Sequence, residues 1–461
     1  VAGANAEWSP HFRWWHIAIF LAILTGSFWL RFNHLADIPH DLHGDMASMG
    51  IQARGWLAGR QPNLFREGWA NIPMVGFLPS AIFLSLFGND LFALNLSAVA
   101  GGMFTLAGLY LLVWRLFDSH RLAALSTAVL AVNIPHIHFS RLAAYMDPWP
   151  FMLFAMFLLV DGLKARRPQS FALAGVLLGI GTQMYYSGRV IVVVLAASLL
   201  YLLIVRPRWL RDNFLGLCLL LVGTLIALGP SLLYFADNWE ALAERSRSVL
   251  VLYEPVMTHL QLKYGLDSTT AVILEQIRRS LLMFNHSVDS STQFGFKHPM
   301  FSSLFSPLIP LGFAYALRRW RTPGLGLSLI WLLVLILFGS VLTNNAPFWP
   351  RLVGVLPVAA VLFALVLDRF WLVLVQLAPK SDRVSATAVL GLMASVLFIF
   401  AGQSNWALYE QTVRQNARPN ALVGRYLAAL PEHIAACGFG SPGPLQVRET
   451  AFLAWPRPLL D

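Results

Sequence analysis

The chain contains 461 residues, of which 57% are hydrophobic and only 12% are charged. An ordinary soluble domain carries about 25% charged residues, so this composition excludes a soluble globular protein and also a disordered or collagen-like chain. The formal net charge of +10 does not indicate a nucleic-acid partner, because the basic residues lie in short connections between apolar segments.

Apolar segments of the length that a membrane-spanning helix requires recur along the whole chain. We predict eleven spans, at residues 14–33, 91–114, 122–139, 146–163, 171–187, 190–205, 214–236, 301–317, 324–343, 352–368 and 385–402. The first apolar run continues into Arg31 without a small-residue cleavage site, so we interpret it as a retained helix and not as a signal peptide. The sequence therefore predicts an all-α polytopic membrane protein.

The basic residues indicate an orientation for these spans. If the N-terminus is cytoplasmic, the even-numbered connections face inward, and these five short connections hold fourteen Lys and Arg residues. The opposite face carries two long loops, at about residues 34–90 and 237–300, and a tail at residues 403–461. Long loops are usually functional, so we expect the chemistry on the outer face. We divide the chain into a transmembrane domain, 1–402, and a short outer segment, 403–461.

The first outer loop holds the most informative segment, residues 38–59. Its apolar residues recur at the spacing of one helix face from residue 49 to residue 57, and Trp56 is typical of a membrane interface. We therefore expect a short helix on the membrane surface with Asp45 at its start. Asp45 is either the N-cap of this helix or a reactive carboxylate. Residues 71–88 contain two prolines in an apolar run, which indicates a further interfacial helix.

The second outer loop and the tail also have helical patterns. Apolar residues recur at helical spacing within 239–250 and within 272–282, and the acidic and basic residues of the loop nearly balance. Such amphipathic helices either cover an active-site cavity or bind a partner. In the tail, residues 421–430 form a predicted amphipathic helix that Pro431 ends.

The order and spacing of several motifs resemble those of the GT-C membrane glycosyltransferases. The branch with the best resemblance contains the bacterial relatives of the dolichyl-phosphate-mannose protein mannosyltransferases, including the aminoarabinose transferases of lipid A. The matching features are the acidic motif at Asp45, an apolar helix that ends in Leu86-Phe87-Gly88, and the segments 140–148, 181–189 and 349–357. The resemblance covers about residues 14–402. It implies a GT-C fold with about eleven transmembrane helices and with interfacial helices in two large outer loops.

The resemblance also implies an activity. It assigns the role of catalytic base to Asp45, in the transfer of a sugar from a polyprenyl-phosphate donor to an acceptor hydroxyl of a protein, a lipid or a glycan. The reaction would take place at the outer face of a bacterial inner membrane. Because a phosphate leaving group departs without protonation, one carboxylate suffices, and attack from the opposite face of the sugar inverts the anomeric centre.

Two departures from the family pattern keep other functions open. The family carries a second acidic residue where this chain has Met46, and His-Pro-Pro or Lys-Pro where this chain has Asn71-Ile72-Pro73. A second hypothesis is therefore a non-catalytic homologue that serves as a subunit of a membrane complex. A transporter of lipid-linked sugars ranks third, because the ionisable residues gather at outer helix ends and not along a path through the membrane midplane.

Further candidate binding residues lie near the predicted outer helix ends. Arg141, Arg189 and Arg351 are predicted to bind the donor phosphate, because a guanidinium group binds phosphate through two parallel hydrogen bonds. Their alternative role is to reach lipid headgroups. Arg54 on the interfacial helix is a weaker candidate, for which a solvated helix face is the favoured interpretation.

Three more residues complete the candidate site. Asp147 either orients the acceptor or pairs with Arg141. Tyr185 and Tyr186 either donate hydrogen bonds to sugar or phosphate or belong to the aromatic belt at the interface. We predict no cofactor. Some GT-C enzymes use a divalent metal, but His136 and His138 lie on different faces of a helix, and the two cysteines build no zinc site.

Overall fold

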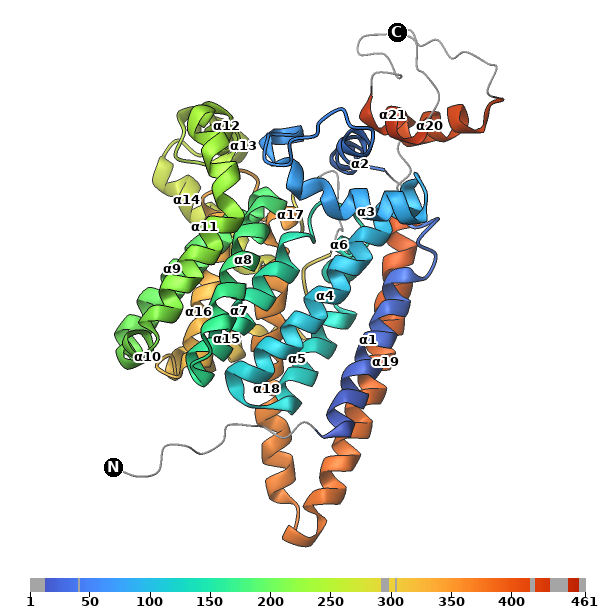
Figure 1. Ribbon diagram of the computed structural model, residues 1–461. Coiled ribbons are helices and arrows are strands. Elements are labelled where there is room, and N and C mark those ends of the chain that lie inside the picture. The colour runs from blue at the N-terminus through green and yellow to red at the C-terminus, as the bar shows by residue number, and fades with distance from the viewer. Residues whose placement is uncertain are drawn as a thin grey trace.

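The computed structural model describes residues 13–39, 42–291, 298–302, 305–414, 419–431 and 447–455. These residues form helices and two isolated β-bridges, and no strand occurs among them. Figure 1 shows a bundle of long helices with shorter helices across its upper end. The prediction of an all-α polytopic membrane fold is confirmed.

Eight helices in the described part are long and apolar enough to cross a membrane. They are α1 (Trp14–Phe32), α4 (Leu91–Phe117), α7 (Pro148–Ala165), α9 (Val190–Val205) with the preceding turn η3 (Tyr186–Arg189), α11 (Phe214–Asp237), α16 (Pro323–Ile336) with η5 (Leu337–Val341), α18 (Val355–Leu377) and α19 (Arg383–Arg414). The shorter helices of the bundle are α5 (His120–Val132), α6 (Ile134–Phe139), α8 (Pro168–Met184) and α15 (Leu308–Arg318).

Each predicted span contains a helix, but the count of eleven membrane-spanning helices is not confirmed. The predicted span 122–139 is divided into α5 and α6, because the side chain of Asn133 accepts a hydrogen bond from the backbone of His136 and so starts a new helix. The helix in span 301–317 begins only at Leu308. In contrast, α19 continues past residue 402, where we predicted the end of the transmembrane domain, to Arg414.

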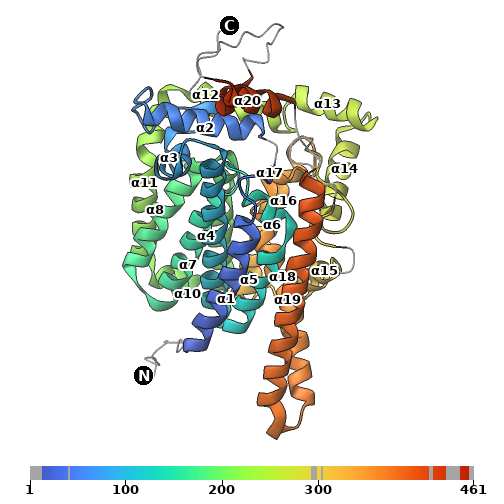
Figure 2. The same cartoon turned by 90° about the vertical axis from the view of Figure 1, so that its right-hand side faces the viewer.

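The two long loops and the tail form the layer at the upper end of the bundle (Figures 1 and 2). The first loop contains α2 (Gly44–Leu57), η1 (Trp69–Asn71), η2 (Met74–Phe77) and α3 (Leu78–Phe87). The second contains α12 (Trp239–Val249), α13 (Glu254–Tyr264), α14 (Thr269–Leu281) and η4 (Leu282–Phe284), and α17 (Trp349–Leu352) lies beneath them. The tail adds α20 (Pro419–Ala429) and α21 (Arg448–Leu453). The helices predicted in both loops and in the tail are therefore present.

The basic connections meet at the opposite end, together with α10 (Pro207–Asp212) and η6 (Lys380–Asp382). Ion pairs join one connection to the next: Arg115 to Asp161 (2.9 Å), Lys164 to Asp118 (2.8 Å), Arg166 to Asp212 (2.9 Å) and Arg121 to Asp368 (2.7 Å). Since the partners come from different predicted inward connections, these connections share one face, as the charge pattern predicts.

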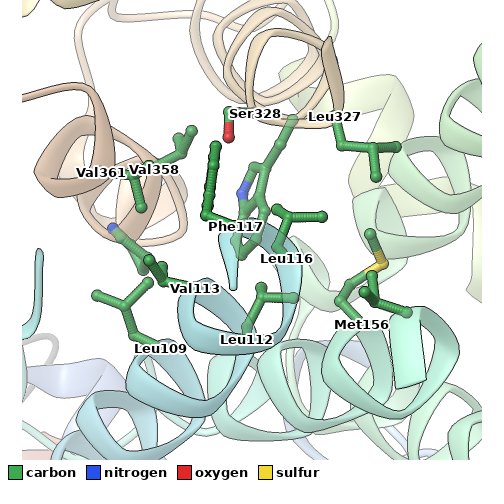
Figure 3. Close-up of a pocket in the computed structure, with 13 residues that line it drawn as sticks. Leu109, Leu112, Val113, Leu116, Phe117, Met156, Leu327, Ser328, Val358 and Val361 are labelled. Atoms are coloured by element: carbon green, nitrogen blue, oxygen red, sulfur yellow. The ribbon is translucent and has the colours of Figure 1, made fainter. Parts of the chain in front are cut away.

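The bundle is closely packed between α4, α7, α16 and α18. The pocket in Figure 3 lies among α4, α7, α16 and α18 and has a volume of only about 20 Å³. Its walls are almost entirely apolar, with Leu109, Val113, Met156 and Val358 among them. A space of this size admits at most a single water molecule. This pocket is therefore too small for a substrate, and the polar residues of the outer layer are the candidates for the functional site.

Candidate functional site

Asp45 lies in the first turn of α2, but it does not cap the helix. The cap is His43, whose Nδ1 accepts a hydrogen bond from the backbone N–H of Asp45 (3.1 Å). The interpretation of Asp45 as an N-cap is therefore wrong. Its carboxylate is half-buried, in the first turn of the helix. The carboxylate is thus available for chemistry.

Other parts of the outer layer hold α2 in place. Arg54 donates hydrogen bonds to the side-chain and backbone oxygens of Asn89 (2.5 and 2.6 Å) and to the carbonyl oxygen of Phe452 (2.8 Å). Its guanidinium group also lies 3.8 Å from the centre of the Phe452 ring. The solvated helix face that we favoured for Arg54 is wrong, because the residue is buried. Arg54 links α2 to α21 and to the start of α4.

Tyr145 contacts Asp45 directly. The residue lies in the connection between α6 and α7, its side chain is 1% exposed, and its hydroxyl donates a hydrogen bond to Oδ2 of Asp45 (2.7 Å). Burial raises the pKa of Tyr145 well above its ordinary value, and the charges of Tyr185 and Asp45 raise it further. The phenol therefore remains a hydrogen-bond donor to the carboxylate at neutral and mildly alkaline pH. The sequence analysis missed Tyr145, although it lies between two of the motif residues, Arg141 and Asp147.

A row of tyrosine rings leads away from Asp45. The ring centres of Tyr145 and Tyr185 are 5.2 Å apart and those of Tyr185 and Tyr186 are 6.1 Å apart, both in edge-to-face geometry. The row exists because α8 ends at Met184 and Tyr185 adopts an extended backbone. The two predicted tyrosines thus lie next to the predicted acidic residue.

Two arginines from distant segments lie at this row. Arg245 of α12 lies 5.9 Å from the centre of the Tyr186 ring, and Arg351 of α17 donates a hydrogen bond to the carbonyl oxygen of Asn344 (2.9 Å). Burial raises the pKa of Tyr185; the charge of Asp45 also raises it, and the charges of Arg245 and Arg351 lower it. One phenol is thus within electrostatic reach of one carboxylate and two guanidinium groups.

The charges of the two arginines are not neutralised locally. Neither Arg245 nor Arg351 has a carboxylate within 4.0 Å in the part of the chain that the structure describes. Burial lowers the pKa of Arg351 to about 10, and the charge of Arg245 lowers it as well, so Arg351 remains cationic at neutral pH. Guanidinium groups without an ion-pair partner within 4.0 Å are suited to binding a phosphate. Arg351 was predicted, whereas Arg245 was not singled out, because its helix has the pattern of a solvated amphipathic helix.

Asp289 supports the segment that carries Arg351. Its Oδ1 accepts hydrogen bonds from the backbone N–H groups of Trp349 and Ser291 (both 3.1 Å), and its Oδ2 accepts one from the hydroxyl of Ser291 (2.5 Å). Burial raises the pKa of Asp289 to about 6 even though these hydrogen bonds oppose the shift. Asp289 thus positions the start of α17.

Arg189 and Asn71 connect the two outer loops. Arg189 lies over the ring of Tyr186 (4.5 Å to its centre) and donates hydrogen bonds to the carbonyl oxygens of Leu242 (3.1 Å) and Asn71 (3.4 Å). The Asn71 side chain donates a hydrogen bond to Oε2 of Glu244 (2.7 Å). At the position where the family pattern has a basic residue or a His-Pro-Pro motif, this chain therefore has a contact between η1 and α12.

Arg141 and Asp147 lie apart from this group of contacts. Arg141 is 0% exposed and donates hydrogen bonds to the carbonyl oxygens of Arg31 (2.5 Å), Ile38 (2.7 Å) and Leu30 (3.4 Å), which makes it a brace for the outer end of α1. The alternative ion pair between Arg141 and Asp147 is not observed. Among the described residues, Oδ2 of Asp147 is buried and has no hydrogen-bond partner.

The described residues contain no group of three His, Cys, Asp or Glu side chains that could hold a metal ion. Nδ1 of His136 lies 2.6 Å from a guanidinium nitrogen of Arg31, and both residues are buried. The site around Asp45 therefore consists of one carboxylate, three tyrosines and three arginines: Asp45, Tyr145, Tyr185, Tyr186, Arg189, Arg245 and Arg351.

Comparisons with known proteins agree with this architecture. The family profile for dolichyl-phosphate-mannose-protein mannosyltransferase matches residues 71–234. A comparison with curated protein sequences found no match. The matched segment includes Tyr145 and Tyr185 but ends before Arg245 and begins after Asp45.

Solved structures extend the similarity to nearly the whole chain. ArnT from Cupriavidus metallidurans bound to undecaprenyl phosphate has a TM-score of 0.60 and 16% identity over 97% of this chain and 85% of ArnT. AglB, the oligosaccharyltransferase of Archaeoglobus fulgidus, in complex with an inhibitory peptide and a dolichol-phosphate, has a TM-score of 0.55 and 16% identity over 96% of this chain and 60% of AglB. The chain thus has the GT-C fold of membrane glycosyltransferases, as the sequence predicts.

Proposed function

We propose that this protein is an inverting glycosyltransferase that transfers a sugar from a polyprenyl-phosphate donor to an acceptor hydroxyl. The observation that carries the proposal is the Asp45 carboxylate, which Tyr145 orients at one end of the tyrosine row, with Arg245 at the Tyr186 end of the same row. The reaction requires a base that takes the proton of the acceptor hydroxyl and cations that stabilise the departing phosphate. One carboxylate and nearby arginines supply these two functions. Two proteins with this fold, ArnT and AglB, have been solved with undecaprenyl phosphate and dolichol-phosphate.

Each group has one role in the proposed step. The carboxylate of Asp45 takes the proton of the acceptor hydroxyl while the oxygen attacks C1 of the sugar. The bond between C1 and the phosphate oxygen breaks, and its electron pair stays on that oxygen. Arg245 and Arg351 stabilise the negative charge that grows on the phosphate. Attack from the face opposite the leaving group inverts the configuration at C1.

The proposal includes a location. We propose that the N-terminus lies in the cytoplasm and the site at the outer face of a bacterial inner membrane. The positive-inside rule supports this orientation, because the basic connections lie at one end of the bundle and the candidate site at the other. Nucleotide sugars are absent from that face. A donor carried across the membrane on a lipid phosphate meets this requirement, and the acceptor is a protein, a lipid or a glycan.

The test compares wild-type protein with Asp45→Asn in proteoliposomes, with a lipid extract as the source of donor and acceptor. Asparagine keeps an oxygen for the Tyr145 hydroxyl and removes the base, so we expect transfer to fall about 100-fold or more. Asp37→Asn, an exposed residue of the same loop, is the matched control. Equal transfer by wild type and Asp45→Asn would refute Asp45 as the base. No transfer by folded wild type with several lipid extracts would favour a non-catalytic subunit.

A further inference from the structure

The end of the bundle opposite the candidate site contains a second group of arginines without ion-pair partners. Seven of the fourteen basic residues in the predicted inward connections pair with carboxylates: Arg115 and Arg167 with Asp161, Arg121 and Arg369 with Asp368, Lys164 with Asp118, and Arg166 and Arg211 with Asp212. Four others, Arg206, Arg318, Arg319 and Arg321, have no carboxylate within 4.0 Å among the residues that the structure describes. This group therefore carries four positive charges without a protein anion.

The four arginines line one pocket. It has a volume of about 520 Å³, and Trp320 and Thr322 complete its wall. The residues that line the pocket come from the end of α9 and from the connection between α15 and α16. These segments lie near α10 at the lower left of Figure 1. Its volume falls within the range of small-molecule binding sites, about 300–1,000 Å³.

The packing of α9 on α16 fixes the shape of this pocket. Tyr201 of α9 is buried, and its hydroxyl donates a hydrogen bond to the carbonyl oxygen of Trp320 (2.6 Å). A Cβ atom at Gly326 would lie 2.2 Å from the Tyr201 side chain, so only glycine allows α16 to approach this closely. The contact holds the connection with three of the arginines beside the end of α9, where Arg206 lies. The cluster is thus positioned by buried residues.

Apolar surface adjoins the pocket on its membrane side. Leu203 and Ile204 precede Arg206 in α9 and are 55% and 68% exposed, and Leu317, 54% exposed, precedes Arg318 in α15. Side chains of this kind contact acyl chains when the helices lie in a membrane. The pocket therefore combines cations at the membrane surface with a lipid-facing apolar wall.

We propose that this pocket binds the headgroup of an anionic phospholipid, with the phosphate among the four guanidinium groups and the acyl chains along α9 and α15. Guanidinium groups bind phosphate through paired, charge-assisted hydrogen bonds. Basic pockets between membrane helices recognise anionic headgroups by this chemistry. A lipid is the favoured source of the phosphate, because a soluble phosphate compound would leave the adjoining apolar residues without a contact.

The experiment measures lipid binding to the purified full-length protein in detergent by native mass spectrometry. Phosphatidylglycerol is the probe and phosphatidylcholine is the neutral reference. We expect wild-type protein to retain one phosphatidylglycerol selectively. The triple variant Arg206→Gln, Arg318→Gln, Arg321→Gln should bind it about tenfold or more weakly, because each basic residue near a headgroup contributes roughly fivefold. If the triple variant does not fold, each single variant should still lose about threefold to fivefold.

A second triple variant, Arg208→Gln, Lys380→Gln, Arg383→Gln, removes the same charge from exposed residues of the same end that do not line the pocket. It should bind phosphatidylglycerol as wild type does. An equal loss in both triple variants, or no preference over phosphatidylcholine, would overturn the proposal in favour of general surface attraction. Binding of inorganic pyrophosphate as tight as that of phosphatidylglycerol would overturn the lipid as the source of the phosphate.

Discussion

Replacing Tyr145 by phenylalanine tests whether the phenol orients the proposed base. The change removes the hydroxyl that donates to Oδ2 of Asp45 at 2.7 Å and keeps the aromatic ring that packs against Tyr185. Because the Tyr145 side chain is buried, water does not readily replace the lost donor. The carboxylate then loses one of the contacts that fix its direction toward the acceptor.

The hydrogen bond sets the size of the expected effect. A hydrogen bond to a charged group contributes about 1.5–3 kcal/mol, and about 1.4 kcal/mol corresponds to a tenfold change in rate. We therefore expect kcat/KM of Tyr145→Phe to fall by about 10- to 150-fold. Since burial raises the pKa of Tyr145 well above 10.0, the wild-type phenol stays protonated through the range in which tyrosine ordinarily titrates, and it causes no loss of activity there.

The assay measures initial rates of sugar transfer in proteoliposomes at limiting and saturating donor. Tyr426→Phe, which makes the same chemical change at an exposed position of α20, should have wild-type rates. A rate for Tyr145→Phe within about twofold of wild type, together with an inactive Asp45→Asn, would refute the proposed role of the phenol. Wild-type rates for both variants would place the base elsewhere.

Three further variants test the roles of buried residues through protein stability. Burial raises the pKa of Asp289 from 3.8 to about 6, so the folded protein holds this proton more tightly than the unfolded chain does. The free energy of unfolding should therefore fall by about 3 kcal/mol between about pH 4 and pH 6, and Asp289→Asn, measured by thermal unfolding across this range, should lose that slope. Gly354→Ala should lower the free energy of unfolding by about 1–3 kcal/mol, because its Cβ atom would lie 2.0 Å from the Trp149 ring. The control Gly26→Ala, whose Cβ atom would have nothing within 4 Å, should be neutral. Equal unfolding temperatures of the two variants would show that the ring moves aside. Arg141→Leu should lower the free energy of unfolding by about 3 kcal/mol, because buried carbonyl oxygens lose their hydrogen-bond donor. Unchanged stability with a raised KM for the polyprenyl-phosphate sugar would instead support phosphate binding by Arg141.

The fold was predictable from the sequence because its signals are local. Apolar runs and alternating basic connections indicate membrane helices from the sequence of each segment alone, without information on which helices pack together. Helix ends inside an apolar run are less visible. The break at Asn133 depends on a side-chain hydrogen bond, and the start of α15 at Leu308 lies inside a run that we predicted as one span.

The candidate site was predictable only in part. Asp45 and Tyr185 lie in segments whose motifs carry the resemblance, so they were found. The contact between Tyr145 and Asp45 joins residues 100 positions apart, and no local pattern reports it. Arg245 lies in a helix whose charges are typical of a solvated surface. Arg141 has the sequence context of an outer helix end, yet the fold buries it, because the outer end of α1 presents several carbonyl oxygens to it.

The contact between α2 and α21 joins two segments that are translated at very different times. Phe452 lies so close to Gly50 that a Cβ atom there would be 2.1 Å from the ring, and Arg448 donates a hydrogen bond to the hydroxyl of Ser48 (3.1 Å). These partners of α2 follow α19 in the chain and are therefore translated after it. During biosynthesis the helix with Asp45 therefore gains its contacts with α21 only after α19 has been made.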